Sequence, residues 1–117
     1  MNNSMMVLLS LLVLAAPVQG SAAEASAERG QALWQQEQMV KGEARSCTNC
    51  HGTDLTQSGQ HIRTKKQIDP MAASVSTDRY RDPKKVAKWF KRNCKWTWGR
   101  ECTAQEKSDI LAYLRAQ

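Results

Sequence analysis

The stretch Cys47-Thr48-Asn49-Cys50-His51 decides how this chain folds, because it has the pattern C-x-x-C-H. Two thiols separated by two residues can add across the two vinyl groups of a haem, since one helical turn places both sulfurs along one edge of the macrocycle. The adjacent imidazole then becomes the proximal ligand of the iron. The motif therefore predicts one covalently attached haem c, held by Cys47, Cys50 and His51.

Three other interpretations compete with haem attachment. A thioredoxin-like redox pair needs a hydrophobic strand before the motif and a mixed sheet, whereas residues 41–46 are polar and the chain is short. A zinc site would have to use Cys94 and Cys102, which are more widely spaced than the close pairs of most zinc sites. The third is a chance match beside a structural disulfide. Haem is favoured because the motif, the export signal and the helical pattern agree.

The N-terminal residues predict export. Val7 to Ala16 is an apolar run, too short to span a bilayer, which needs about 20 apolar residues. Small residues and helix breakers follow between Pro17 and Ala23, as they do at the end of a secretory signal peptide. We expect a signal peptide over residues 1–23, a domain over residues 24–117 and a periplasmic location. An uncleaved anchor or a buried helix is the competing interpretation.

Residue spacing predicts helices around the motif. Residues 27–40 have a moderate helical pattern, residues 53–66 are polar and suggest a loop, and residues 71–75 form a small apolar patch. Thr103-Ala104-Gln105-Glu106 matches a capping box, so a last helix is expected to begin at Thr103. No alternating strand pattern is evident. The predicted fold class is an all-α domain wrapping one cofactor.

A further helix is predicted from Asp82, a good N-cap, with Pro83 at its first position. One face of this helix consists of Val86, Trp89, Phe90 and Asn93. The first three are apolar, and only Asn93 is polar. Residues 96–99 break the pattern, so Asn93 is expected near the end of the helix.

Positive charge is concentrated in one part of the chain. The net charge is +6, and residues 79–100 contain nine Lys and Arg against the single acid Asp82. A basic face attracts anionic partners and raises association rates. For an exported protein, nucleic acid is excluded as the expected partner, and an acidic protein or a lipid surface is favoured. The alternative is a solvated helix face with no partner.

Two cysteines, Cys94 and Cys102, remain once the motif has taken the other two. An exported compartment is oxidising, so we expect a disulfide between them. It would join the end of one helix to the start of the next and hold the neighbouring residue Asn93 in place.

Three residues are candidates for the sixth position on the iron. His61 lies in a polar segment where exposure is expected, and Met71 follows Pro70 in the small apolar patch. Asn93 is a polar amide on an apolar face, where it needs a partner. That partner is either the iron or a backbone group near the helix end. Spacing alone does not decide among these candidates.

Five segments together resemble the sphaeroides haem protein family, which consists of small class I-type c-type cytochromes. The segments are Cys47–His51, Asp69–Ser74, Lys88–Lys95, Gly99–Thr103 and Glu106–Leu114, and they span nearly all of the expected domain. The most specific is Arg92-Asn93-Cys94-Lys95, with a second cysteine eight residues after the first. The resemblance implies a class I cytochrome c-like fold, Asn93 as the distal iron ligand and a Cys94–Cys102 bridge.

The resemblance also implies a function. It is that of a cytochrome that binds O₂ or NO when reduced and accepts electrons from a dihaem cytochrome c or a membrane cytochrome b. Such a protein could also act as an oxidoreductase on oxygen or nitric oxide. The alternative is a plain electron-transfer cytochrome with Met71 as the sixth ligand and no ligand chemistry. A third hypothesis is a thiol–disulfide enzyme without haem.

Overall fold

The computed structural model describes residues 15–16 and 23–117. The predicted signal peptide falls outside the described residues except for positions 15, 16 and 23, so it stays a prediction. The elements, in order, are α1 (Ala27–Gln35), β1 (Gln38–Val40), β2 (Glu43–Arg45), α2 (Thr48–His51), β3 (Gly59–Gln60), β4 (Gln67–Ile68), α3 (Pro83–Trp98) and α4 (Ala104–Arg115). Among these helices none is long and apolar enough to cross a membrane.

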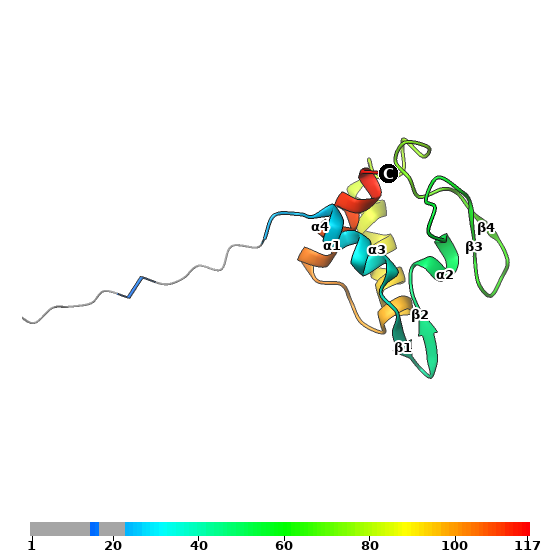
Figure 1. Cartoon of the computed structure of the whole chain (residues 1–117), viewed down its shortest axis with the longest axis horizontal. Helices are drawn as coiled ribbons and strands as arrows, with labels where there is room; N and C mark the ends of the chain where they lie inside the picture. The colour runs from blue at the N-terminus through cyan, green and yellow to red at the C-terminus, as the bar shows by residue number, and fades with distance from the viewer. Residues whose placement is uncertain (1–14, 17–22) are drawn as a thin grey trace, which may run out of the picture.

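The first and last helices cross at close range (Figure 1). Gly30 in α1 allows this, because a Cβ on it would lie 1.9 Å from the backbone oxygen of Asp109 in α4. The Asp109 carboxylate accepts hydrogen bonds from the Arg29 side chain and from the Ser26 backbone N–H, at 2.8–3.0 Å. Ser26 is also the N-cap of α1. One buried carboxylate thus fixes both the start of α1 and its position on α4.

The prediction for the last helix is confirmed. The Thr103 hydroxyl accepts from the Glu106 N–H, and the Glu106 carboxylate accepts from the Thr103 N–H. The start of α3 is confirmed as well, with the Asp82 carboxylate accepting from the N–H groups of Lys84 and Lys85.

The predicted break at residues 96–99 is wrong. Helix α3 continues to Trp98, because Thr97 and Trp98 are buried and extend its inner face. Gly99, with φ of 70°, adopts the left-handed conformation that ends the helix. Asn93 therefore lies inside α3, not at its end.

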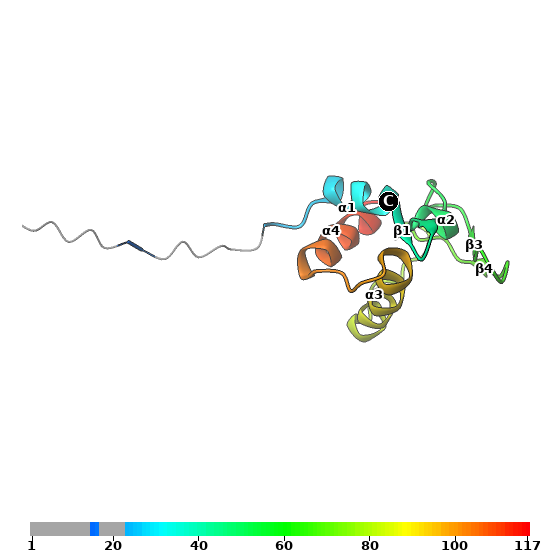
Figure 2. The same ribbon diagram turned by 90° about the horizontal axis from the view of Figure 1, so that it is seen from below.

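The expectation of a strand-free chain is also wrong, although the strands are short. The helix predicted over residues 27–40 ends at Gln35, and β1 pairs antiparallel with β2 around Lys41 and Gly42, both at positive φ. Lys41 and Gly42 form this turn, in place of a continued helix. A second ladder pairs β3 with β4 inside the predicted loop. Figure 2 shows this second hairpin on the far side of α2 from the α1–α4 pair.

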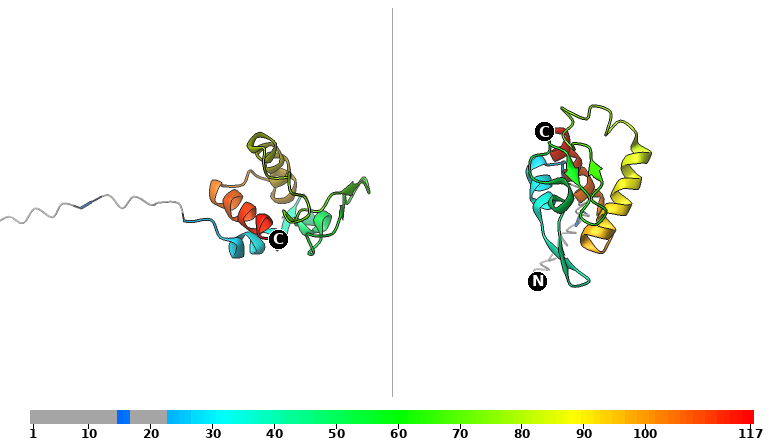
Figure 3. Two further views of the ribbon diagram at one scale, coloured as in Figure 1. Left: turned by 90° about the horizontal axis from the view of Figure 1, so that it is seen from above. Right: turned by 90° about the vertical axis from the view of Figure 1, so that its right-hand side faces the viewer.

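The core gathers residues from every helix except α2 and from the segment after β4. Its buried members are Trp34, Leu55, Met71, Ala72, Cys94, Trp98, Cys102, Ile110, Tyr113 and Leu114. Met71 and Ala72 confirm the apolar patch predicted over residues 71–75, whereas Val75 is exposed. The helices predicted from the sequence thus surround the motif, as an all-α cytochrome c-like fold requires. In the left view of Figure 3, α1, α3 and α4 lie on one side of α2 and the β3–β4 hairpin lies on the other.

Candidate haem site

A cavity of about 580 Å³ lies between the motif and α3. Pockets of roughly 300–1,000 Å³ hold small molecules and cofactors. Cys47, Cys50 and His51 line this cavity from the motif, and Asn93 lines it from α3. Apolar and aromatic side chains complete the wall, among them Trp34, Met71, Val86, Trp89, Phe90, Trp98, Ile110 and Leu114. The structure therefore brings all four predicted site residues to one cavity.

The motif is held in shape by its own backbone. Thr48 to His51 form one helical turn, α2, as predicted from the spacing of the two thiols. The Ser46 N–H donates to the Asn49 side chain at 2.6 Å, and Gly52, at positive φ, closes the turn by donating to the Thr48 oxygen. The β3–β4 hairpin rests on this turn, because a Cβ on Gly59 would lie only 2.3 Å from the Cys50 oxygen.

His51 has the surroundings of a neutral imidazole. Its ring lies 5.2 Å from the Trp34 ring, centroid to centroid. Burial, helped by the positive charge of Arg79, lowers the pKa of His51 to about 4. The ring is therefore uncharged at pH 7, which is the form that binds a metal ion.

The two motif thiols are not joined to each other. Burial raises the pKa of Cys47 to about 12, so this thiol stays protonated at neutral pH. A protonated, buried thiol is a poor nucleophile for disulfide exchange, because the thiolate is the reactive form. This argues against a thioredoxin-like redox pair.

Asn93 has an amide that the protein leaves free. Its side chain is exposed to the cavity and makes no hydrogen bond with any residue of the described part of the chain. The alternative roles weighed for it, capping the helix or binding a loop carbonyl, are therefore not the roles seen. Its three companions on the predicted face, Val86, Trp89 and Phe90, line the same cavity.

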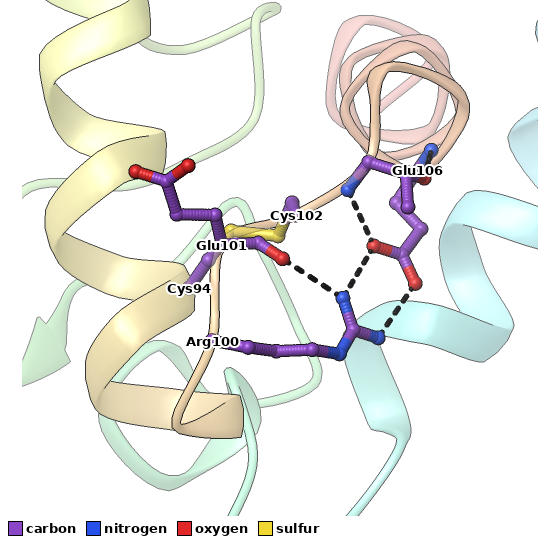
Figure 4. The surroundings of a disulfide bond; sticks show 6 residues. Cys94, Arg100, Glu101, Cys102 and Glu106 are labelled. Atoms are coloured by element: carbon purple, nitrogen blue, oxygen red, sulfur yellow. Dashed lines mark hydrogen bonds and ion pairs between the residues drawn. A yellow bond between two sulfur atoms is a disulfide. The ribbon is translucent and has the colours of Figure 1, made fainter.

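The backbone that follows Asn93 is fixed at two points. Cys94 forms a disulfide with Cys102, as predicted, with Cα atoms 5.7 Å apart (Figure 4). The bond also removes these two cysteines as ligands for zinc. Two residues further along, the buried Arg45 guanidinium donates to the Trp96 backbone oxygen at 2.9 Å and lies 4.6 Å from the Trp96 ring.

Figure 4 also shows what holds the segment that carries Cys102. Arg100 donates to both carboxylate oxygens of Glu106, at 2.8 and 2.9 Å, and to the backbone oxygen of Glu101. This pairing ties the connection between α3 and α4 to the first turn of α4.

The two remaining candidates for the sixth position also line the cavity. Met71 is 9% exposed, belongs to the core cluster, and accepts a hydrogen bond from the Tyr80 hydroxyl on its backbone oxygen. His61 lies in the turn of the β3–β4 hairpin and is half-buried, not fully exposed as expected.

Three buried nitrogen atoms test whether a haem fits this cavity. Among the described residues, Nδ1 of His51 and the indole nitrogens of Trp34 and Trp98 have no hydrogen-bond partner. All three side chains line the cavity. An unpaired buried polar atom costs about 1–3 kcal/mol, so the site is built for a group that also offers acceptors. A haem has two carboxylates that can accept from the indole nitrogens of Trp34 and Trp98, a large apolar ring that matches the apolar wall, and an iron that the His51 imidazole can bind, so these residues fit it.

Sequence reasoning missed three residues of the site. No role at the site was predicted for Trp34, whose ring lies 5.2 Å from the His51 ring. None was predicted for Arg45, which links the segment before the motif to α3, or for Arg79, whose charge helps to lower the pKa of His51. A buried arginine two residues before the motif has no local signature, because its partner lies 51 residues away in the chain.

Known proteins resemble this chain over most of its length. The family model described as a domain of unknown function, DUF1924, matches residues 20–114. The cytochrome c-type protein SHP of Cereibacter sphaeroides is 50% identical over 96 residues, which cover 81% of this chain and 74% of that protein.

Two solved structures resemble the model. The structure of oxidized SHP, described as an oxygen-binding cytochrome c, has a TM-score of 0.74 and 50% identity, covering 80% of this chain and 83% of the other. The solution structure of cytochrome c'' from Methylophilus methylotrophus, which addresses haem-ligand detachment, has a TM-score of 0.67 and 31% identity, covering 77% and 73%. The chain belongs to the DUF1924 family and is a sphaeroides haem protein-type cytochrome c, whose cofactor is covalently bound haem c.

Proposed function

We propose that this protein is a periplasmic cytochrome that accepts an electron from a partner protein and, once reduced, binds O₂ or NO. Cys47 and Cys50 form the thioether links, His51 is the proximal ligand, and Asn93 is a replaceable distal ligand. The observation that carries this proposal is the free amide of Asn93, directed to the same cavity as the motif and without a partner in the described protein. The bound haem supplies an iron that changes oxidation state and takes axial ligands.

The two sides of the site hold their ligands differently. His51 is half-buried and neutral, and its ring lies beside that of Trp34, so its imidazole is oriented before any ligand arrives. An amide oxygen is a harder and weaker donor than imidazole or thioether, and it suits reduced iron less well than oxidised iron. Reduction should therefore weaken the hold on Asn93 and leave His51 in place.

The movement of Asn93 should be confined to its side chain. Cys94 is tied to Cys102 by the disulfide, and the Trp96 carbonyl is tied to Arg45. Because the backbone directly after Asn93 is held at these two points, rotation about the side-chain torsions is the least costly way to vacate the sixth position. Such a swing leaves α3 folded in both oxidation states.

The relatives support gas binding and ligand exchange. SHP is described as oxygen-binding, and cytochrome c'' as undergoing haem-ligand detachment. We extend the first property to this chain on the strength of 50% identity and of the Asn93 geometry.

The electron donor is proposed to be an acidic dihaem cytochrome c or a membrane cytochrome b. Two of the nine cations of residues 79–100 are already paired, Arg81 with Asp78 and Arg100 with Glu106, and Arg79 donates to backbone oxygens. The other six lie exposed on α3 and make no ion pair with described residues: Lys84, Lys85, Lys88, Lys91, Arg92 and Lys95. We call these six the basic face. Unpaired cations on one helix favour a partner over a self-neutralised surface.

The second candidate is a plain electron shuttle with Met71 as the distal ligand. It is kept because Met71 lines the same cavity as His51. Absorption spectra of the purified protein, together with mixing of the ferrous form with NO, separate the two. A replaceable Asn93 predicts that the ferric state lacks the absorption band of iron–methionine ligation and that the ferrous state takes up NO rapidly.

The variants sharpen this test. Asn93→Met should introduce the methionine band and slow NO uptake, whereas Met71→Leu, which conserves volume in the core, should leave both unchanged. If Asn93→Met leaves NO uptake unaffected, Asn93 does not occupy the sixth position. If Met71→Leu removes a methionine band that the unmodified protein shows, Met71 is the sixth ligand. Either result would refute the proposal.

A further inference from the structure

A second cavity, of about 480 Å³, lies beside Asn93 and is lined mainly by basic side chains. Its wall consists of His61, Lys91, Arg92, Asn93, Lys95 and Trp96. We call it the side cavity. The side cavity adjoins the haem cavity, because four residues line both: His61, Arg92, Asn93 and Trp96.

Charge in the side cavity is of one sign. Lys91, Arg92 and Lys95 line it, and no Asp or Glu does so in the described part of the chain. None of these three cations forms an ion pair with a described residue. Three unpaired cations around a concave space attract a negatively charged ligand, because they focus the local potential.

His61 adds a fixed hydrogen-bond donor to these charges. Its Nδ1 accepts from the backbone N–H groups of Arg63 and Thr64, each at 3.2 Å. A nitrogen that accepts carries no proton, so in the neutral ring the proton resides on Nε2. His61, which lines both cavities, therefore carries its N–H on Nε2 in the neutral form, and its ring cannot turn without breaking two hydrogen bonds.

The hairpin that carries His61 is itself firmly placed. The His61 N–H donates to the Lys66 oxygen at 2.8 Å, and the Lys65 N–H donates to the His61 oxygen at 2.9 Å. Gly59, at the base of the hairpin, lies directly against the Cys50 oxygen. The donor is thus positioned relative to the motif helix by backbone contacts alone.

We propose that the side cavity binds a small inorganic oxyanion of the nitrate or nitrite class, held by His61 Nε2–H, Lys91 and Lys95 beside the Asn93 side chain. A planar anion with several acceptor oxygens matches several converging donors, and hydrogen bonds to charged groups are the stronger kind. This site needs no movement of Asn93 to be filled, so it goes beyond the proposed gas binding. An anion bound there would lie next to the residue proposed as the replaceable ligand.

The test is a nitrate titration of the oxidised holoprotein, the state in which Asn93 is proposed to hold the iron, followed by ¹H–¹⁵N NMR. Saturable shifts are expected at the amides of residues 61–66 and 91–96. Lys91→Gln with Lys95→Gln should raise the nitrate dissociation constant about tenfold or more, as should His61→Phe, since a hydrogen bond to a charged group is worth about 1.5–3 kcal/mol. Lys84→Gln with Lys85→Gln is the matched control, because it removes the same charge from the other end of α3, and it should change the constant less than twofold.

Two results would overturn the inference. Shifts that do not saturate, or that weaken equally in the control pair, would show general screening by salt. A His61 Nε2–H signal that nitrate leaves unmoved would show that the donor is already occupied, for example by a carboxylate of the haem. Neither result bears on Asn93→Met and NO uptake, so the proposed function is judged separately.

Discussion

Replacing Gly30 by alanine tests whether the α1–α4 crossing supports the haem cavity. The added Cβ would lie 1.9 Å from the Asp109 carbonyl oxygen, 2.6 Å from its carbon and 2.7 Å from the Tyr113 Cβ. The first two are backbone atoms of α4, so no rotamer change relieves the overlap and the two helices must move apart. Overpacking of this kind costs typically 1–3 kcal/mol, and a backbone clash belongs at the upper end or above it.

A second effect opposes this cost. Alanine is a better helix former than glycine by about 1 kcal/mol, which stabilises α1 itself. The clash is larger, so we expect a net loss of about 2 kcal/mol or more in the free energy of unfolding. With a urea m-value at the lower end of the usual range for small domains, about 1–2 kcal/mol per molar, the midpoint should fall by roughly 1–2 M.

The assay is urea unfolding of the mature haem-bearing protein, followed by circular dichroism and by the haem absorption band. Gly42→Ala is the control, because a Cβ there would meet nothing within 4 Å, although Gly42, unlike Gly30, has a positive φ. It should cost only the backbone strain, about 1–2 kcal/mol. A Gly30→Ala midpoint equal to or above that of the unmodified protein would refute the close crossing, and with it the placement of Trp34 beside His51.

Three further predictions concern the disulfide, the basic face and Asp109. Cys94→Ser with Cys102→Ser should lower the free energy of unfolding by about 2–3 kcal/mol in urea titrations, since the bond closes a short loop, and an unchanged midpoint would contradict this. Lys84→Glu, Lys85→Glu and Lys88→Glu together should slow reduction by an acidic cytochrome in stopped-flow at low salt, with the difference shrinking at high salt; equal rates at low salt would leave the basic face a solvated surface. The Arg29 hydrogen bond holds the pKa of Asp109 at about 2, below its ordinary 3.8, so the stability it contributes is present above pH 4 and lost as pH falls toward 2. Thermal melts of Asp109→Asn should lack that loss, and a melt profile that still falls over this pH range just as in the unmodified protein would argue that other carboxylates cause it.

The helices that carry the site could be predicted because their signals are local. Asp82 with Pro83, and Thr103 with Glu106, specify helix starts through contacts within one turn. The motif turn is equally local, since Cys47 to His51 is a single helical turn. The Cys94–Cys102 disulfide needed only the number of cysteines and an oxidising compartment.

The features that sequence reasoning missed depend on contacts between distant segments. The helix predicted over residues 27–40 stops at Gln35, and residues 38–40 instead pair with residues 43–45 in a short β-ladder. Strands of three residues have too weak a sequence pattern to be predicted. The extension of α3 to Trp98 depends on burial against the core, which local propensity does not report. The orientation of His61 depends on a turn whose residues are all polar and carry no periodic pattern.

Met71 illustrates what the structure adds to a question the sequence left open. Pro70-Met71 was a plausible axial-ligand segment, and Met71 does line the haem cavity. It is also packed within the core cluster, while Asn93 has a free amide. The choice between them therefore rests on the spectra of Asn93→Met and Met71→Leu.

The attachment of haem through Cys47 and Cys50 is the claim on which all the others depend. Mass spectrometry of a tryptic digest of the exported protein tests it most directly, because cleavage after Arg45 and Arg63 releases a peptide that contains both thiols and His51. The account predicts that this peptide carries the added mass of one haem and that no other peptide does. Recovery of the peptide with the mass of its bare amino acids, from cells with a working cytochrome c maturation system, would contradict it.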